Sequence, residues 1–181
     1  MSRLTALDPD DSTNKSKELF DVIKKKMGMV PNMMRTMGNS PSVLNGYLGF
    51  SGALEGASLG SKLSELIALT VANENGCDYC NAAHTFVGGK KGIDSNAIDM
   101  ARDGFSTDLK TKAALEFAKE VLATKGRVSD ISIESIKNAG YNDGAIAEII
   151  ASVALSVFTN YFNNVADTEI DFPKLSLINK N

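Results

Sequence analysis

Stretches with helical periodicity recur along almost the whole chain of 181 residues, each bounded by a capping residue or a glycine. Their apolar residues return every three or four positions, as on one face of a helix, while the alternation typical of strands is almost absent. Small polar residues before these stretches and glycines after them are typical helix boundaries. The sequence therefore predicts an all-α fold.

In the N-terminal part, the pattern predicts a helix over about 13–27 and a short Met-rich helix that ends at Met37. Ser40 and Pro41 have the capping and first-turn chemistry of a third helix, which the small-residue segment 49–60 is expected to loosen. The residues expected to face inward in these helices are Leu19, Ile23, Met27, Val43, Leu44, Tyr47 and Leu48.

Further along, Ser61 is expected to cap a helix that runs to Asn75, and Gly76 to provide the turn after it. The next helix is predicted over about 78–87, with its end at Gly88 and Gly89. Four more helices are predicted to begin at Asp94 or Ser95, at Thr107 or Asp108, near Ile133 and at Asn142. They are expected to end before Gly104, at Gly126, at Gly140 and at about Ala166, and the tail after Pro173 is expected to be irregular.

The length and composition suit one globular domain, which we expect to span residues 1–181. Hydrophobic residues make up 43% of the chain, which is enough for a sizeable core. Nineteen basic and twenty-two acidic residues give a net charge of −3, so the sequence has no basic footprint for nucleic acid or for an anionic membrane. We expect neither as a partner.

The cytoplasm is the expected location. The N-terminal residues lack an apolar segment and reach acidic residues almost at once, which is unlike a signal peptide. The longest uncharged stretch, 149–166, contains serine, threonine and asparagine residues that would be costly in lipid, so it is predicted to be a buried core helix. Two cysteines without an export signal are typical of a reducing compartment, where a close pair is more often catalytic or metal-binding than structural.

Cys77, Cys80 and His84 gather the only two cysteines and the only histidine of the chain into eight residues. On a helix these positions share one face. A thiolate is the reactive form of cysteine, and a nearby helix start or imidazole promotes its formation. The cluster therefore predicts a redox-active dithiol that carries its own base.

Glu65 is predicted to join this cluster. If Gly76 separates two antiparallel helices, Glu65 lies eleven residues before the turn and His84 eight after it. At about 1.5 Å per residue the two differ in height by roughly one turn, so the carboxylate could reach the imidazole. The predicted order of the groups is Glu65, His84 and Cys80, with Cys77 nearest the helix start.

This arrangement suits the reduction of a peroxide. A Cys80 thiolate that attacks a peroxide oxygen would become a sulfenic acid, and Cys77 could condense with it to a disulfide if the Cα atoms lie about 4.4 to 6.8 Å apart. An external dithiol would then have to reduce the pair. The predicted activity is that of a thiol-dependent antioxidant peroxidase for hydrogen peroxide or small organic hydroperoxides.

Glu65, eleven intervening residues, Cys77-x-Tyr79-Cys80 and then His84 form a pattern that resembles the AhpD-like alkylhydroperoxidase motif of the carboxymuconolactone decarboxylase superfamily. The likeness extends over most of the chain, as in the peroxidase-related branch of that superfamily. It implies an AhpD-like helical domain with the redox motif at the start of a central helix, assembled as a homo-oligomer, either a trimer or a hexamer.

The resemblance also implies a role for each residue of the motif. Cys80 would attack the hydroperoxide, Cys77 would resolve the product, and His84 with Glu65 would form the proton relay. Tyr79, which lies where some characterised enzymes carry a histidine, would line the site. The electrons would come from a dithiol reductant or an adaptor protein, and no cofactor or metal is implied.

Other functions remain open at this stage. Two cysteines and one histidine are zinc ligands, yet a structural zinc site needs a fourth ligand and the sequence has no second cluster. A thioredoxin-like role would need a neighbouring βαβ pattern, which is not predicted. A general thiol–disulfide oxidoreductase and a non-enzymatic redox sensor on the same fold are the remaining alternatives.

Overall fold

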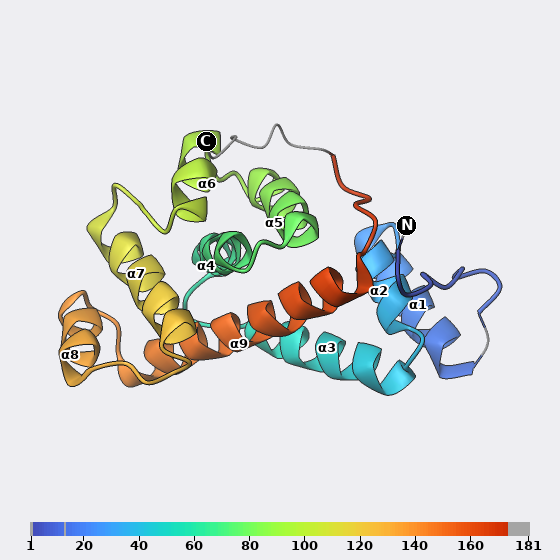
Figure 1. Ribbon diagram of the computed structural model, residues 1–181, viewed down its shortest axis with the longest axis horizontal. Coiled ribbons are helices and arrows are strands. Elements are labelled where there is room, and N and C mark those ends of the chain that lie inside the picture. Colours follow the sequence, from blue (N-terminus) through green and yellow to red (C-terminus); the bar gives the residue numbers. More distant parts are fainter. Residues whose placement is uncertain (1, 13, 174–181) are drawn as a thin grey trace.

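A computed structural model describes residues 2–12 and 14–173, and within them the chain forms nine helices and no strand (Figure 1). The prediction of an all-α fold is confirmed. The helices are α1 (Asn14–Met27), α2 (Asn32–Met37), α3 (Pro41–Leu54), α4 (Ser61–Glu74), α5 (Asp78–Lys90), α6 (Ser95–Arg102), α7 (Leu109–Ala123), α8 (Asp130–Asn138) and α9 (Asp143–Ala166). The predicted irregular tail after Pro173 lies outside the described residues.

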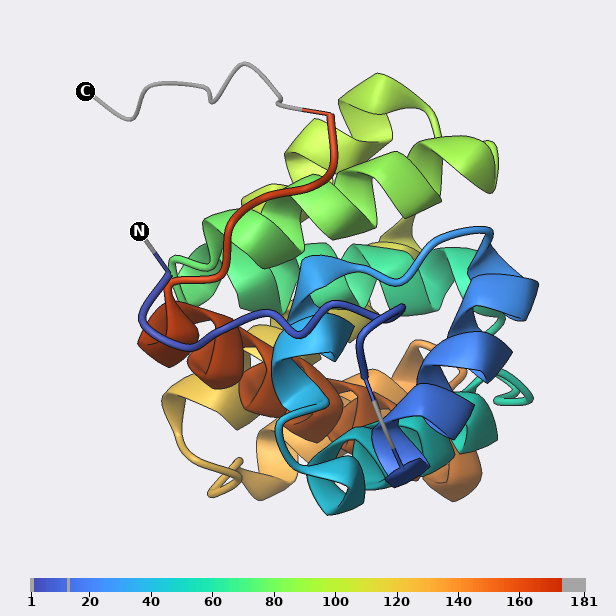
Figure 2. The ribbon, with the colours of Figure 1, turned by 90° about the vertical axis from the view of Figure 1, so that its right-hand side faces the viewer.

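Helix α4 lies at the centre of the fold and packs against α5, α6, α7 and α9 (Figure 1). The long helix α9 runs beneath it, beside α3, while α1 and α2 lie at one end of the molecule and α7 and α8 at the other. After α9, the segment 167–173 crosses over α5 (Figure 2). Helix α5, which begins with the cysteine motif, is thereby covered on two sides.

Two hydrophobic clusters share this framework. The larger one is built by α4, α6, α7, α8 and α9, and the smaller one mainly by the first five helices. Both cysteines belong to the smaller cluster, so the predicted redox pair lies in the interior. The fully buried side chains of this cluster are Phe20, Met37, Leu44, Ala72 and Cys77.

Most helix boundaries follow the capping chemistry of the sequence. Asp94, Asp108 and Asn142 precede α6, α7 and α9, and each side chain accepts a hydrogen bond of 2.7 to 2.9 Å from a backbone N–H of the first turn. Ser61 was expected to do the same for α4. That prediction is wrong, because Gly60 occupies the N-cap with no side-chain bond.

Two helices are longer than predicted. Helix α3 continues through the small residues to Leu54, and α5 continues through Gly88 and Gly89 to Lys90. Gly88 is buried within this helix. The left-handed residue after α5 is instead Gly92, with φ of +71°.

The predicted apolar faces need correction at two positions. Met27 and Val43 were expected to face inward, but they are 45% and 37% exposed. On α1, Phe20 is fully buried in place of Met27. On a helix, a shift of one residue rotates the face by about 100°. The i, i+4 pattern therefore predicted where the helix lies in the sequence but not which side faces the core.

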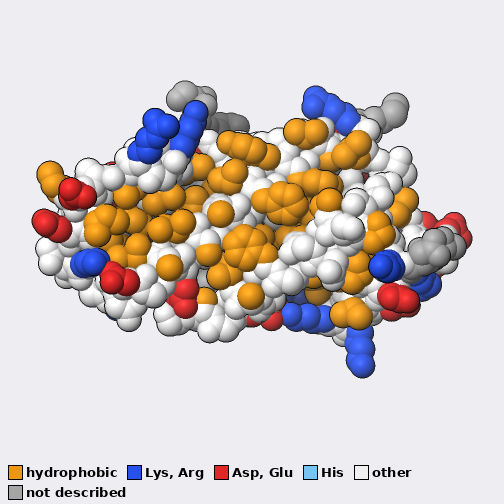
Figure 3. Space-filling model, turned by 90° about the horizontal axis from the view of Figure 1, so that it is seen from below, with side chains coloured by type: hydrophobic (Ala, Val, Ile, Leu, Met, Phe, Trp, Pro, Cys, Tyr) orange, Lys and Arg blue, Asp and Glu red, His pale blue; other side chains and the backbone are white. Residues whose placement is uncertain are grey.

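Helix α9 is, among the described residues, the one helix long and apolar enough to span a membrane, with 44% of its most apolar window buried. A core helix meets the same criteria, and α9 packs against α4 and α7. Its other side carries an exposed apolar stripe, in the face shown in Figure 3, where hydrophobic side chains spread across the middle and charged ones lie toward the edges. The stripe consists of Ile150, Phe158, Tyr161 and Val165.

Candidate active site

Cys77 and Cys80 form a disulfide at the start of α5. Their Cα atoms lie 5.3 Å apart, and the residues are 0% and 3% exposed. Cys77 is the N-cap of the helix, and its Sγ accepts a hydrogen bond of 3.2 Å from the backbone N–H of Cys80. Both sulfurs therefore lie at the positive end of the helix dipole, which favours thiolates when the pair is reduced.

Glu65 on α4 binds two side chains, one from α5 and one from the residue that follows it. Its Oε2 lies 2.7 Å from Nδ1 of His84, and its Oε1 accepts a hydrogen bond of 2.6 Å from Nζ of Lys91. Burial by itself would raise the pKa of the Glu65 carboxyl. The hydrogen bonds and charges of His84 and Lys91 outweigh burial, so this pKa lies below its ordinary value. Glu65 is therefore a carboxylate that orients the imidazole.

A cavity of about 570 Å³ connects these groups. Cys80, His84 and Glu65 line it, whereas Cys77 does not. No direct hydrogen bond joins His84 to Cys80 within the described part of the chain, and in the disulfide the sulfur has no proton to share. The structure thus places the four predicted residues together, with Cys80 as the sulfur that faces the cavity.

The cavity has both apolar and polar side chains in its lining. The apolar side chains from α1, α2, α3 and the segment after α9 include Ile23, Met33, Met34, Leu48 and Phe172. Besides the polar groups already described, α9 contributes polar side chains at positions that share one face of the helix: Ser152, Ser156, Thr159 and Asn163. An organic ligand with one polar group would fit such a site.

Tyr79 lines the same cavity but is 5% exposed. Its hydroxyl oxygen accepts a hydrogen bond of 3.1 Å from the backbone N–H of Met33, and the ring of Phe172 packs against it edge-on at 5.6 Å. Burial raises the pKa of the Tyr79 hydroxyl. Tyr79 therefore remains neutral and links α5 to α2.

Sequence reasoning missed Lys91 and Asn163. Lys91 follows His84 by seven positions and so shares its face of α5, but the predicted end of the helix at Gly88 hid this relationship. The Nδ2 atom of Asn163 lies 3.4 Å from the Sγ of Cys80. Its only signal in the sequence was its polarity within a long apolar helix.

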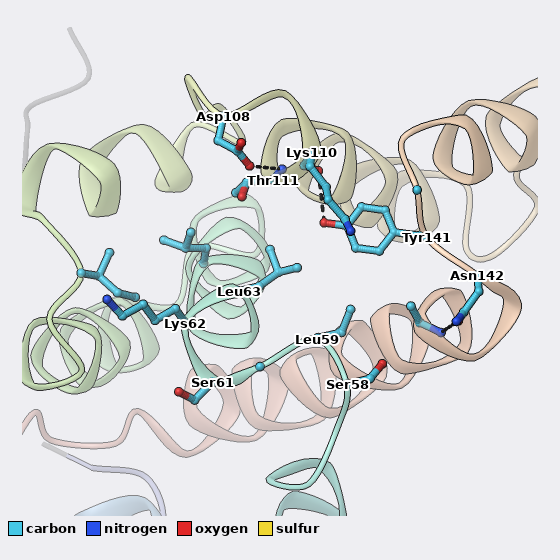
Figure 4. A pocket seen from close by; sticks show the side chains of 15 residues that line it. Ser58, Leu59, Ser61, Lys62, Leu63, Asp108, Lys110, Thr111, Tyr141 and Asn142 are labelled. Atoms are coloured by element: carbon cyan, nitrogen blue, oxygen red, sulfur yellow. Dashed lines mark hydrogen bonds between the residues drawn. The ribbon is translucent and has the colours of Figure 1, made fainter.

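A second hollow of about 660 Å³ lies between the starts of α4, α7 and α9 (Figure 4). Lys62, Lys110 and Asp108 lie at its edges, and the Tyr141 hydroxyl donates to the backbone carbonyl of Lys110 at 3.1 Å. None of the predicted site residues lines it. Within residues 2–12 and 14–173, no three His, Cys, Asp or Glu side chains are grouped so as to hold a metal ion.

Residues 41–121, from the start of α3 into α7, match the model of the carboxymuconolactone decarboxylase family. This segment contains the whole Glu65, Cys77, Cys80 and His84 constellation. This match and the solved structures described below support a place in the AhpD-like carboxymuconolactone decarboxylase superfamily. No match was found among curated proteins.

Solved structures agree with this AhpD-like fold over almost the whole chain. An uncharacterized peroxidase-related protein from Ralstonia eutropha JMP134, described as an alkylhydroperoxidase AhpD core, matches with a TM-score of 0.85 and 20% identity over 94% of this chain and 92% of its own. A peroxidase-related protein from Silicibacter sp. TM1040 matches with a TM-score of 0.81 and 22% identity over 93% and 94%. The debrominase Bmp8 matches with a TM-score of 0.79 and 22% identity over 94% and 93%. At these identities the likeness concerns the fold.

Proposed function

We propose that the protein is a thiol-dependent peroxidase that reduces hydrogen peroxide or organic hydroperoxides through a Cys77/Cys80 dithiol–disulfide cycle. The observation that carries the proposal is the position of Cys80: it forms a disulfide with Cys77 and lines a cavity together with the His84–Glu65 pair. Cytoplasmic antioxidant defence is the setting that best suits such a cycle.

In the first step, His84 takes the proton of the Cys80 thiol, directly or through one water. The thiolate attacks one peroxide oxygen, an S–O bond forms and the O–O bond breaks. The leaving alkoxide takes the proton from His84, which yields a sulfenic acid on Cys80 and one alcohol. Glu65 stabilises the imidazolium between these two transfers, because its carboxylate lies 2.7 Å from the ring.

In the second step, the sulfur of Cys77 attacks the sulfur of Cys80. The S–S bond forms, the S–O bond breaks and water leaves, so that two thiols have supplied the two electrons that reduce the peroxide. A Cα separation of 5.3 Å allows this bond. An external dithiol, either a small molecule or an adaptor protein, then reduces the disulfide and closes the cycle.

The cavity supports an organic hydroperoxide over hydrogen peroxide as the preferred substrate. Its volume of about 570 Å³ is larger than hydrogen peroxide needs, and its apolar side chains from α1, α2 and α3 suit an organic group. We expect a larger kcat/KM for cumene hydroperoxide than for hydrogen peroxide.

The decisive experiment is steady-state peroxide consumption with a dithiol reductant, for the wild type, Cys80→Ser and Cys77→Ser. Loss of sulfenic acid formation in Cys80→Ser alone, with a trapped sulfenic acid in Cys77→Ser, is the expected pattern. Equal peroxide consumption by both variants and the wild type would reject the proposal. Stoichiometric oxidation without turnover under any dithiol supply would instead identify a redox sensor.

Reductive dehalogenation is a second candidate, favoured by the fold shared with the debrominase Bmp8 and by the largely apolar cavity. The same dithiol could replace a carbon–bromine bond by carbon–hydrogen, with bromide released and the disulfide formed. Bromide release from a brominated aromatic compound, dependent on Cys80, would select this chemistry. Peroxide turnover without bromide release would exclude it.

A further inference from the structure

The C-terminal part of α9 brings an amide against the redox pair. Asn163 is 3% exposed, and its Nδ2 lies within hydrogen-bond distance of the Sγ of Cys80, at 3.4 Å. The two residues are 83 positions apart in the chain, and none of the predicted site residues comes from α9. The contact gives Cys80 a donor that is separate from the imidazole.

The oxygen of this amide is not used in a hydrogen bond among the described residues. Oδ1 of Asn163 is buried and has no hydrogen-bond partner among the described residues. A buried acceptor without a partner is costly, and in native proteins it often marks a place where a ligand or water binds. Since Asn163 lines the cavity together with Cys80 and His84, its free acceptor lies beside the sulfur that reacts.

Neighbouring asparagines hold Asn163 in this position. Nδ2 of Asn75 donates to Oδ1 of Asn160 at 2.9 Å, and Nδ2 of Asn164 donates to the backbone carbonyl of Asn75 at 3.0 Å. Asn75 belongs to the turn that leads into Cys77. The two bonds fasten this part of α9 to the start of α5, so Asn163 is fixed relative to the sulfurs.

We propose that Asn163 is a further catalytic residue, which binds the sulfur of Cys80 with its N–H and the hydroperoxide with its carbonyl oxygen. The inference rests on the proposed peroxidase function. In the reduced protein, Nδ2 donates to the Cys80 thiolate, and Oδ1 accepts the hydrogen of the substrate O–OH group. One side chain then positions both reacting atoms, which lowers the entropic cost of reaching the attack geometry.

The proton and electron balance is unchanged by this role. The thiolate attacks the oxygen whose hydrogen Asn163 binds, and that hydrogen stays on the oxygen as the S–O bond forms. The O–O bond breaks, and the leaving alkoxide takes the proton that His84 removed from the thiol. The products are the sulfenic acid of Cys80 and an alcohol, so Asn163 itself neither gains nor loses a proton.

The first test measures the thiol pKa of Cys80, from the pH dependence of its alkylation by iodoacetamide. The Cys77→Ser background leaves a single thiol, and Asn163→Ala and Asn163→Asp are compared in it. We expect a raised pKa in Asn163→Ala and a higher one in Asn163→Asp, because aspartate has the same shape but replaces the donor by a negative charge. A merely structural role would not produce this order.

The matched control for this titration is Asn45→Ala, on an exposed position of α3, which should leave the thiol pKa unchanged. The other titratable groups that line the cavity with Cys80 are the same in all variants, and only Asn163→Asp adds a carboxylate, at position 163 itself, so a difference reports on that position. These groups are Lys26, Tyr47, Glu55, Glu65, Tyr79, His84 and Lys91.

The second test measures the rate of sulfenic acid formation with cumene hydroperoxide, at a pH where the thiol is fully ionised in each variant. We expect the rate constant to fall roughly ten- to a hundred-fold in Asn163→Ala, because this variant loses the acceptor for the hydroperoxide hydrogen. Asn163→Asp keeps the volume of the side chain and an acceptor oxygen, so its raised thiol pKa decides the question if Asn163→Ala does not fold.

The outcomes separate the two proposals. If the Cys77→Ser protein forms no sulfenic acid at all, the peroxidase function fails, while the titration still reports whether Asn163 stabilises the thiolate. If it reacts with peroxide and both Asn163 variants match it in thiol pKa and in rate, the role of Asn163 is rejected and the peroxidase function stands.

Discussion

The imidazole of His84 and the carboxylate of Glu65 meet between α4 and α5, with Nδ1 of the ring 2.7 Å from Oε2 of the carboxylate. This contact occupies Nδ1 and leaves Nε2 as the ring nitrogen that can exchange a proton in the cavity. The second carboxylate oxygen is held by Lys91 at 2.6 Å. The orientation of the only histidine is therefore fixed by a buried and doubly bound carboxylate.

Glu65→Gln is expected to lower kcat/KM for cumene hydroperoxide by roughly 100-fold, the scale of a lost proton-transfer group. Glutamine has the same shape but cannot stabilise the imidazolium. The control is Glu18→Gln, on an exposed position of α1. A rate for Glu65→Gln within two-fold of that control would show that the carboxylate plays no part in the chemistry.

The same carboxylate should make the folded state sensitive to acid. Because the pKa of Glu65 is lowered by folding, its stabilisation is present above the ordinary carboxyl pKa of about 4.3 and is lost as the pH falls through the lower folded value. Urea unfolding at pH 7 should show Glu65→Gln less stable than wild type by about 1–3 kcal/mol. At pH 2 to 3 the difference should shrink, and a constant difference would contradict the assignment.

Lys91→Met is expected to move the acidic limb of the pH–rate profile to higher pH. Lys91 is one of the two side chains that lower the pKa of Glu65, so its removal raises that pKa while His84 remains bound. The maximal rate should change little. An unshifted acidic limb, with kcat/KM measured from pH 3 upward, would remove Lys91 from the relay.

The apolar stripe of α9 predicts self-association. Its exposed members lie on one face of a helix with no charged residue after Glu148, next to α3, which has none at all. We expect the wild type to sediment as an oligomer at micromolar concentration and Tyr161→Glu to sediment as a smaller species. Leu109→Glu, at an 81% exposed position outside the stripe, is the control. A purely monomeric wild type would count against this interface.

The hairpin geometry of the site could be predicted because it depends on counting residues from one turn. Gly76, with φ of +59°, ends α4, and the positions of Glu65 and His84 on either side follow from the helical rise. The disulfide partners could also be predicted, because the sequence has no other cysteines.

The remaining parts of the site could not be predicted, because they depend on tertiary packing. Helix α5 continues through Gly88 and Gly89 to Lys90, so the predicted end of the helix offered no reason to place Lys91 near Glu65. Asn163 reaches Cys80 only because α9 crosses the start of α5. A polar residue in an apolar helix indicates a buried contact but does not identify its partner.

The most direct test of the central claim is mass spectrometry of the reduced protein after one equivalent of cumene hydroperoxide. The wild type should lose two hydrogen atoms, the mass change of an intramolecular Cys77–Cys80 disulfide. Cys77→Ser should retain α5, because serine is a preferred N-cap, and should carry a dimedone adduct on Cys80. The absence of both products, or a dimedone adduct on Cys77 in Cys80→Ser at the same rate, would contradict the account.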